Sequence, residues 1–326
     1  MSTPKRIIHT LAIPVLVAVV LELLCLTQGQ NIITNAKSFD NFVVYTAIVM
    51  ITTMALSINL NSGRFDFSLG SMAALSSVIG AQITYSLMSG QKGSSFVMLI
   101  ITLIVGVVLG LISGGIYVIL RLPPIITSLG VTLIYEGILY TLTSGKYVMK
   151  TVQNNSMSAF VSTWVYAFII ITVVLIFMIV VFEKTTFGYD YLALKSGQKV
   201  AINTGIKEVK NALICYGICG GLMGIVGFLN AARNTTINGG QLNFGSIAIM
   251  FTAFLPMFIG GYIGGYCNEK VGYLLAAVCM SLLNSTFAVF SNQVTASTQS
   301  IINAVLLVVF LIYLNNNNLI KRLFRP

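Results

Sequence analysis

The stretch SFVMLIITLIVGVVLGLISGGIYVIL, Ser95–Leu120, contains no charged residue. It is longer than the roughly 20 residues that a helix needs to cross the hydrocarbon core of a bilayer. Nine other runs resemble it, and all are continuous rather than alternating, which favours helices over the strands of a membrane barrel. The ten predicted spans are 7–27, 42–60, 67–88, 95–120, 125–143, 160–182, 211–229, 245–263, 271–290 and 299–314.

The composition predicts that lipid is the solvent for most of this chain. Only 8% of residues are charged, 56% are hydrophobic and the mean hydropathy is +0.92. An ordinary soluble domain carries about 25% charged residues. We therefore expect an all-α, polytopic membrane protein in which residues 1–326 form one transmembrane domain. The longest polar stretch is 183–211.

The distribution of Lys and Arg predicts the orientation. With the N-terminus inside, 13 of the 18 basic residues fall on the cytoplasmic side and five fall outside. Cytoplasmic loops of membrane proteins collect such residues, so the net charge of +10 indicates topology and not a nucleic-acid partner. An even number of spans then places both termini in the cytoplasm. The run that follows Lys5 and Arg6 is long for a signal peptide and has no small-x-small cleavage site, so we expect an uncleaved first helix.

Small residues recur at a spacing of four in two spans, which predicts closely packed helices. The glycines concerned are Gly106, Gly110 and Gly114 in the fourth span, and Gly217/Gly221 and Gly220/Gly224 in the seventh.

A faint internal similarity links the third and eighth spans, which open with Gly70-Ser71-Met72-Ala73 and Gly245-Ser246-Ile247-Ala248. An inverted repeat of spans 2–5 and 7–10 would produce it, and such repeats are common in transporters. Chance would also produce it. The segment 62–70 before the third span is compatible with a broken or re-entrant piece.

Several chemistries are missing from the sequence. It has no Walker-type nucleotide loop and no zinc-protease motif. Cys215 and Cys219 share a helix face, but the only histidine is His9 and no third ligand is near, so we read these cysteines as packing residues. No catalytic residue, metal or cofactor is therefore expected.

Three carboxylates lie in or beside the predicted spans: Glu22, Asp66 and Glu136. A charge at the bilayer centre is costly, so each needs an explanation. Glu136 either contacts a transported solute or is a buried structural group. Asp66 either forms a local cap or ion pair, or lies in the pathway or gate of a transporter. Glu22 reaches the interface more readily. Ion-coupled carriers usually have a chain of such groups, whereas these three carboxylates are scattered. Ion-coupled transport is therefore a second hypothesis, and a non-transport membrane protein is a third.

Three motifs in the same order resemble the permease subunits of bacterial ABC importers of the ribose and simple-sugar group, which includes nucleoside and autoinducer-2 permeases. The first is GYDYLALKSGQKVAINTGI, Gly188–Ile206, in which Gly188, Ala193, Ala201, Gly205 and Ile206 match the family pattern. The others are Arg121–Gly130 with Thr143-Ser144-Gly145, and Phe65–Gly70.

The resemblance implies a function and partners. It implies a permease that moves a small polar solute, a monosaccharide foremost or alternatively a nucleoside, across the bacterial cytoplasmic membrane by alternating access. ATP would be hydrolysed on a separate ATPase subunit, an extracytoplasmic solute-binding protein would deliver the solute, and a second permease, identical or homologous, would complete the pore. The segment 183–211 would be the loop that couples to the ATPase. The candidate residues are Gly188, Ala193, Ala201 and Gly205 for coupling, and Asp66, Ser68, Glu136 and Asn243 for the solute path.

The chain also departs from the family pattern. Glu136 stands where many sugar permeases have Arg, and Gln241-Leu242-Asn243 stands where Glu-Leu-Asp is usual. In the coupling loop, Lys195 and Gly197 replace Gly and Asn, and Lys199 replaces a frequent Glu. These changes leave the solute open and suggest an altered docking groove on the ATPase.

Overall fold

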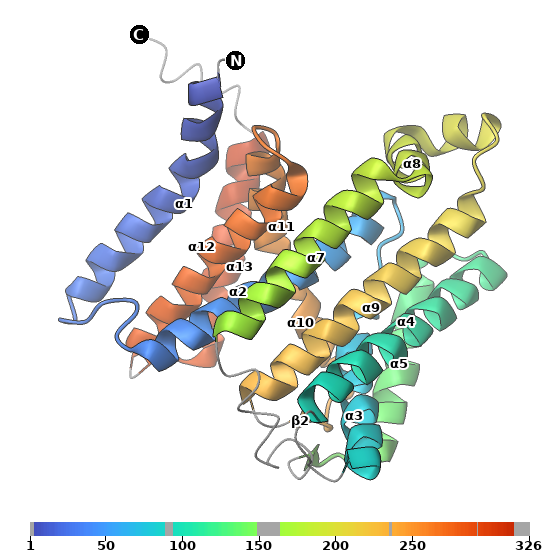
Figure 1. Cartoon of the computed structure of the whole chain (residues 1–326), viewed down its shortest axis with the longest axis horizontal. Helices are drawn as coiled ribbons and strands as arrows, with labels where there is room; N and C mark the ends of the chain where they lie inside the picture. The colour runs from blue at the N-terminus through green and yellow to red at the C-terminus, as the bar shows by residue number, and fades with distance from the viewer. Residues whose placement is uncertain (1–2, 89–93, 149–163, 235–236, 292, 316–326) are drawn as a thin grey trace.

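Helices make up every long element of the computed structural model, which describes residues 3–88, 94–148, 164–234, 237–291 and 293–315 (Figure 1). The helices are α1 (Thr3–Leu26), α2 (Ala36–Asn61), α3 (Leu69–Met88), α4 (Ser94–Leu120), α5 (Pro124–Thr143), α7 (Trp164–Lys184), α8 (Thr186–Asn203), α9 (Glu208–Asn234), α10 (Ile247–Phe251), α11 (Phe254–Gly264), α12 (Glu269–Val289) and α13 (Ala296–Asn315). Two short strands, β1 (Tyr147–Val148) and β2 (Ile237–Asn238), pair antiparallel with Tyr147 opposite Asn238. The all-α, polytopic prediction is confirmed.

Nine of the ten predicted spans contain described helical segments that are long and apolar enough to cross a membrane. The exception is α3, whose polar side chains lower its hydropathy but are mostly buried inside the protein. The predicted span 160–182 begins in residues outside those described, where Lys92, Lys150, Lys321, Arg322 and Arg325 also lie.

The predicted span 245–263 is present over Ile247–Gly264, but a turn divides it into two helices. The chain forms the short helix α10, makes a turn at Thr252 and Ala253, and continues as α11. Pro256 explains the break, because it has no N–H to donate to the carbonyl of Thr252 and fits the first turn of a helix.

Burial separates the central helices from those at the periphery. In the apolar window of α2, 89% of residues are buried, and in that of α9, 78%. The same fraction is 11% for α1 and 0% for α13. α2 and α9 therefore form the core, and α1 and α13 expose most of their apolar side chains, as expected for helices that face lipid or a second subunit.

The glycines of α4 and α9 lie in direct backbone contact, which confirms the packing predicted from their spacing. A Cβ on Gly106 would overlap the carbonyl oxygen of Gly220, and one on Gly110 would overlap that of Tyr216. On the other helix, a Cβ on Gly224 would overlap the carbonyl of Thr102. The helices approach this closely only because these positions carry no side chain.

The segment between α2 and α3 is not helical. The chain turns at Gly63, which has a φ of 72° that favours glycine, and α3 starts only at Leu69. Immediately inside α3, a Cβ on Gly70 would overlap the carbonyl oxygen of Ser246. The two openings that suggested an inverted repeat therefore touch each other, although the repeat itself stays a prediction.

Candidate functional site

The carboxylate of Glu136 is completely buried and holds the turn that precedes α10. Its Oε1 accepts hydrogen bonds from the backbone N–H of Ser246 at 2.8 Å and from the Ser246 hydroxyl at 2.6 Å. Its Oε2 accepts one from the N–H of Phe244 at 2.9 Å. Asn243 and Phe244 have φ values of 54° and 67°, a conformation that is strained for residues with side chains. Glu136 thus stabilises a strained turn in the middle of the fold.

Asp66 does the same for the segment that precedes α3. It is fully buried, and its Oδ1 accepts from the N–H of Ser68 at 2.8 Å and from the Ser68 hydroxyl at 2.6 Å. The Ser68 hydroxyl lies 3.3 Å from that of Ser113 on α4. Asp66, Ser68 and Glu136 are therefore engaged by the chain itself, whereas Asn243 is exposed. Their role in the solute path stays a prediction.

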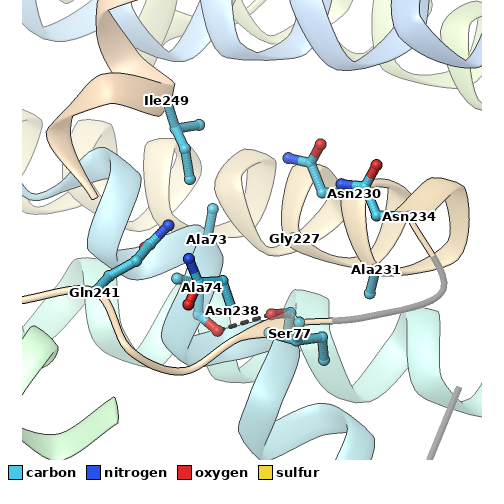
Figure 2. A pocket seen from close by; sticks show the side chains of 11 residues that line it. Ala73, Ala74, Ser77, Gly227, Asn230, Ala231, Asn234, Asn238, Gln241 and Ile249 are labelled. Carbon is cyan, nitrogen blue, oxygen red and sulfur yellow. Dashed lines mark hydrogen bonds between the residues drawn. The ribbon is translucent and has the colours of Figure 1, made fainter. Parts of the chain in front are cut away.

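A cavity of about 200 Å³ with a mixed polar and apolar lining lies between α3, α9, β2 and the segment that leads to α10 (Figure 2). In Figure 1 β2 lies at the end of the molecule opposite α8. The lining residues are Ala73, Ala74, Ser77, Gly227, Asn230, Ala231, Asn234, Ile237, Asn238, Gln241 and Ile249. None of them is ionisable. Sequence reasoning named two of these residues, Gln241 in a departure from the family pattern and Ala73 in the internal similarity. The spacing of Asn230 and Asn234 by one helical turn was a signal for the α9 side of the cavity.

The predicted coupling loop is mostly helical. α8 consists of two helical pieces that meet at Gly197, where the backbone is not helical, and the second piece spans 198–203. Thr185 caps α8 by accepting a hydrogen bond from the N–H of Gly188 at 3.2 Å, and a Cβ on Gly188 would overlap the carbonyl of Phe182. Ala201 is also buried, at 4% exposure. Gly205 has a φ of 95° and is exposed at the turn into α9, and Ala193 is half-buried.

This segment exposes several large apolar side chains alongside charged ones such as Lys199 and Lys207. The apolar ones are Tyr189, Leu192, Val200, Ile202 and Val209, with exposures of 41–70%. The matched family residues Gly188 and Ala201 thus shape the segment from within, while neighbouring positions form its surface. The coupling role of all four matched residues stays a prediction.

The side chains of Lys195 and Tyr191 tie α8 to α12 and α2. Lys195 Nζ lies 3.3 Å from Glu269 Oε1 at the start of α12. Glu269 also accepts hydrogen bonds from Asn61 at 3.3 Å and from the hydroxyl of Tyr273 at 2.6 Å. The hydroxyl of Tyr191 on α8 donates to the carbonyl of Ile58 at 3.0 Å. Two of these contacts reach the last turn of α2, directly before the segment that contains Asp66.

The family model described as branched-chain amino acid transport system / permease component matches residues 38–314. This chain belongs to that permease family. The expected family resemblance is therefore confirmed, and the bundle of apolar helices is that of a multi-pass membrane permease. The match covers all helices from α2 to α13, including α8 and the segments that Asp66 and Glu136 hold.

Curated relatives of this permease are similar along most of their length. The fructose import permease protein FruG of Bifidobacterium longum is 23% identical, over 92% of this chain and 90% of the relative. The autoinducer 2 import system permease protein LsrC of Photorhabdus luminescens is 24% identical, over 73% and 70%. The galactose/methyl galactoside import permease protein MglC of Haemophilus influenzae is 23% identical, over 77% and 78%. No solved structure gives a significant match to the chain.

Proposed function

We propose that this permease is the membrane subunit of an ABC importer and carries a small, uncharged, hydroxyl-rich solute, a monosaccharide foremost, across the bacterial cytoplasmic membrane. The family match over residues 38–314 carries the proposal. The names of the relatives support the solute class, since they include import permeases for fructose and for galactose and methyl galactoside.

The partners follow from the same proposal. An ATPase subunit binds the exposed apolar side chains of α8, and an extracytoplasmic binding protein delivers the solute at the opposite end. A second permease subunit completes the pore. Two fructose import permease proteins of Bifidobacterium longum, FruG and FruF, are both similar to this chain, which supports a pair of identical or homologous permeases.

The proposed orientation places α8 in the cytoplasm. The start of α1 lies at the same end of the molecule as α8 (Figure 1), and Arg6 near that start donates to the carbonyl of Tyr266, close to Glu269. A cytoplasmic α8 therefore implies a cytoplasmic N-terminus, in agreement with the distribution of basic residues.

In the proposed mechanism, closure of the ATPase pair moves α8. The Lys195–Glu269 ion pair and the Tyr191–Ile58 hydrogen bond pass this movement to α12 and to the end of α2. The segments before α3 and α10 meet where Gly70 touches Ser246. A shift at this contact opens the centre of the fold to one side of the membrane and closes it to the other. All ATP chemistry stays on the partner subunit.

Reconstitution tests the proposal. The permease, purified with its ATPase and an extracytoplasmic binding protein, is placed in proteoliposomes, and uptake of radiolabelled D-fructose and D-galactose is measured with and without ATP. We expect uptake that requires ATP and all three components. Equal uptake by vesicles that contain this chain alone would contradict the proposal and favour an ion-coupled carrier.

A further inference from the structure

A buried cation without a carboxylate partner lies shortly before α3. Arg64 is 2% exposed, and among the described residues no carboxylate forms an ion pair with it. Its Nε donates to the hydroxyl of Ser62 at 3.2 Å, and its Nη2 donates to the Oδ1 of Asn211 at 3.3 Å. Both acceptors are neutral, and both bonds are longer than the roughly 2.7–2.9 Å of a guanidinium–carboxylate bond. The buried Nη1 atom donates to no described residue. Because a buried charge is costly unless it is paired, Arg64 is incompletely satisfied here.

The carboxylate of Asp66, two residues later, has one oxygen with little engagement. Ser68 donates two short bonds to its Oδ1. Within the described part of the chain, its Oδ2 accepts one long bond, from Asn59 Nδ2 at 3.5 Å. The Oδ1 of Asn59 is buried and accepts no bond there. A buried cation and a buried anion on one short segment are thus both left with weakly used atoms.

Arg64 and Asp66 can reach each other. Cα atoms two residues apart are separated by at most about 7 Å, and the chain is neither helix nor turn at these two positions. A change of the Arg64 rotamer therefore suffices to bring the guanidinium to the carboxylate. Such a pair is commonly bidentate, so it would satisfy Nη1 and Oδ2 together. Arg64 has two possible arrangements, one with the neutral amide of Asn211 and one with Asp66.

Asn211 connects this choice to α8. It is buried near the start of α9, and its Oδ1 accepts from Arg64 while its Nδ2 donates to the carbonyl of Phe187 on α8 at 3.5 Å. In Figure 1 α8 lies at the end of the molecule where α9 begins. The bond to Phe187 has the greatest length that still counts as a hydrogen bond, so a small displacement of α8 breaks it. The amide of Asn211 is then free to turn away from Arg64.

We infer that Arg64 is a positioning residue that alternates between two partners. It binds Asn211 in the arrangement described, and it binds the carboxylate of Asp66 when α8 is displaced. The inference rests on the proposed function for the force that moves α8. Pairing with Asp66 changes the course of the segment between α2 and α3, and α3 begins beside the contact of Gly70 with Ser246. Asn211 and Arg64 thus form a relay from α8 to the start of α3.

Asn211→Asp tests the relay because it gives Arg64 a permanent carboxylate partner. We expect the thermal midpoint in nanodiscs to rise, since the buried charge is then paired. ATP-driven uptake of D-fructose or D-galactose by the reconstituted importer should fall about five-fold, since Arg64 no longer leaves its partner. Asn31→Asp makes the same change at an exposed position between α1 and α2, and this control should alter neither measurement.

The outcomes separate this inference from the proposed function. Equal uptake by Asn211→Asp and Asn31→Asp would show that Arg64 need not leave Asn211, which overturns the relay. A lower thermal midpoint together with lower uptake would reveal only a damaged contact between α8 and α9, and this also overturns it. Absence of ATP-driven uptake by the wild type would contradict the proposed function itself, whereas normal wild-type uptake confines a failure to the relay.

A double-mutant cycle identifies the partner of Arg64. Arg64→Gln is combined in turn with Asn211→Ala and with Asp66→Asn, and thermal midpoints of the importer are measured without nucleotide and after trapping with ATP and vanadate. Effects of residues that contact each other are not additive. We expect Arg64 to be non-additive with Asn211 in one condition and with Asp66 in the other, and the same partner in both would contradict the inference. If Asp66→Asn does not fold, the Asn211 cycle decides alone, because its non-additivity must differ between the two conditions.

Discussion

Glu136 on α5 accepts two hydrogen bonds from Ser246, a residue 110 positions later in the chain. The bonds join the first half of the protein to the second at the point where Gly70 touches the carbonyl of Ser246. A buried carboxylate with three donors is well satisfied, so this contact stabilises the centre of the fold.

Glu136→Gln should destabilise the permease and alter uptake. An amide has one acceptor oxygen in place of two, so at least one of the donors at Phe244 and Ser246 loses its partner, at about 1–3 kcal/mol. Thermal unfolding in nanodiscs, followed by intrinsic fluorescence, measures the loss. Glu22→Gln is the control because, among the described residues, Glu22 accepts one bond, from Ile32 at 3.3 Å, at a partly buried position. An unchanged midpoint for Glu136→Gln would contradict the structural role.

Gly70→Ala should lower stability and transport, because its Cβ would overlap the carbonyl of Ser246. The matched control is Gly115→Ala on α4, where a Cβ has nothing within 4 Å. That control should be neutral or stabilise by up to about 1 kcal/mol through helix propensity. Thermal midpoints of the two variants decide, and equal midpoints would show that the close approach at Gly70 is not needed.

Lys195→Ala should reduce the amount of solute imported per ATP without lowering the thermal midpoint. The Lys195–Glu269 pair is about one-third exposed, and such pairs contribute roughly 0–1 kcal/mol to stability, yet this one joins α8 to α12. The measurement is uptake divided by ATP hydrolysed in proteoliposomes. Lys199→Ala removes an exposed charge from α8 beyond the break at Gly197 and is the control. Restoration by the double variant Lys195→Glu/Glu269→Lys would support the pair, and equal ratios in wild type and Lys195→Ala would argue against it.

Val200→Asp should weaken attachment of the ATPase while the permease stays folded, since Val200 is 70% exposed and its apolar surface is available to a partner. Ala201→Trp, at a residue that matches the family's coupling loop, is a less suitable variant. At 4% exposure, Ala201 has no room for an indole, so that variant should also disturb α8. Co-purification of the ATPase with Val200→Asp, compared with Lys207→Asp as a control, tests the surface. Full retention of the ATPase by Val200→Asp would contradict it.

Lys199→Cys should react with a membrane-impermeant maleimide in inverted vesicles and not in intact spheroplasts. Gln30→Cys should show the opposite pattern, since the two positions are predicted to lie on opposite sides. Labelling of Lys199→Cys from the outside would reverse the topology and exclude coupling through α8.

The sequence determined the class of the protein because the bilayer imposes strict requirements. A segment in lipid must satisfy its own backbone hydrogen bonds, so long apolar runs such as Ser95–Leu120 become helices whatever their neighbours are. The glycine spacing in α4 and α9 was equally readable, because close approach needs the absence of a Cβ on one face. The family motifs lie within single segments, and they were recognised for that reason.

Only the tertiary structure decided what those helices bring together. The Glu136–Ser246 and Lys195–Glu269 contacts join residues 110 and 74 positions apart, and no local pattern encodes such pairs. The cavity between α3, α9 and β2 is likewise built from separate segments, which only packing brings together. Backbone hydrogen bonding within an apolar segment forms each helix, but the free energy of packing determines which helices are neighbours. The candidate site depends on those neighbours.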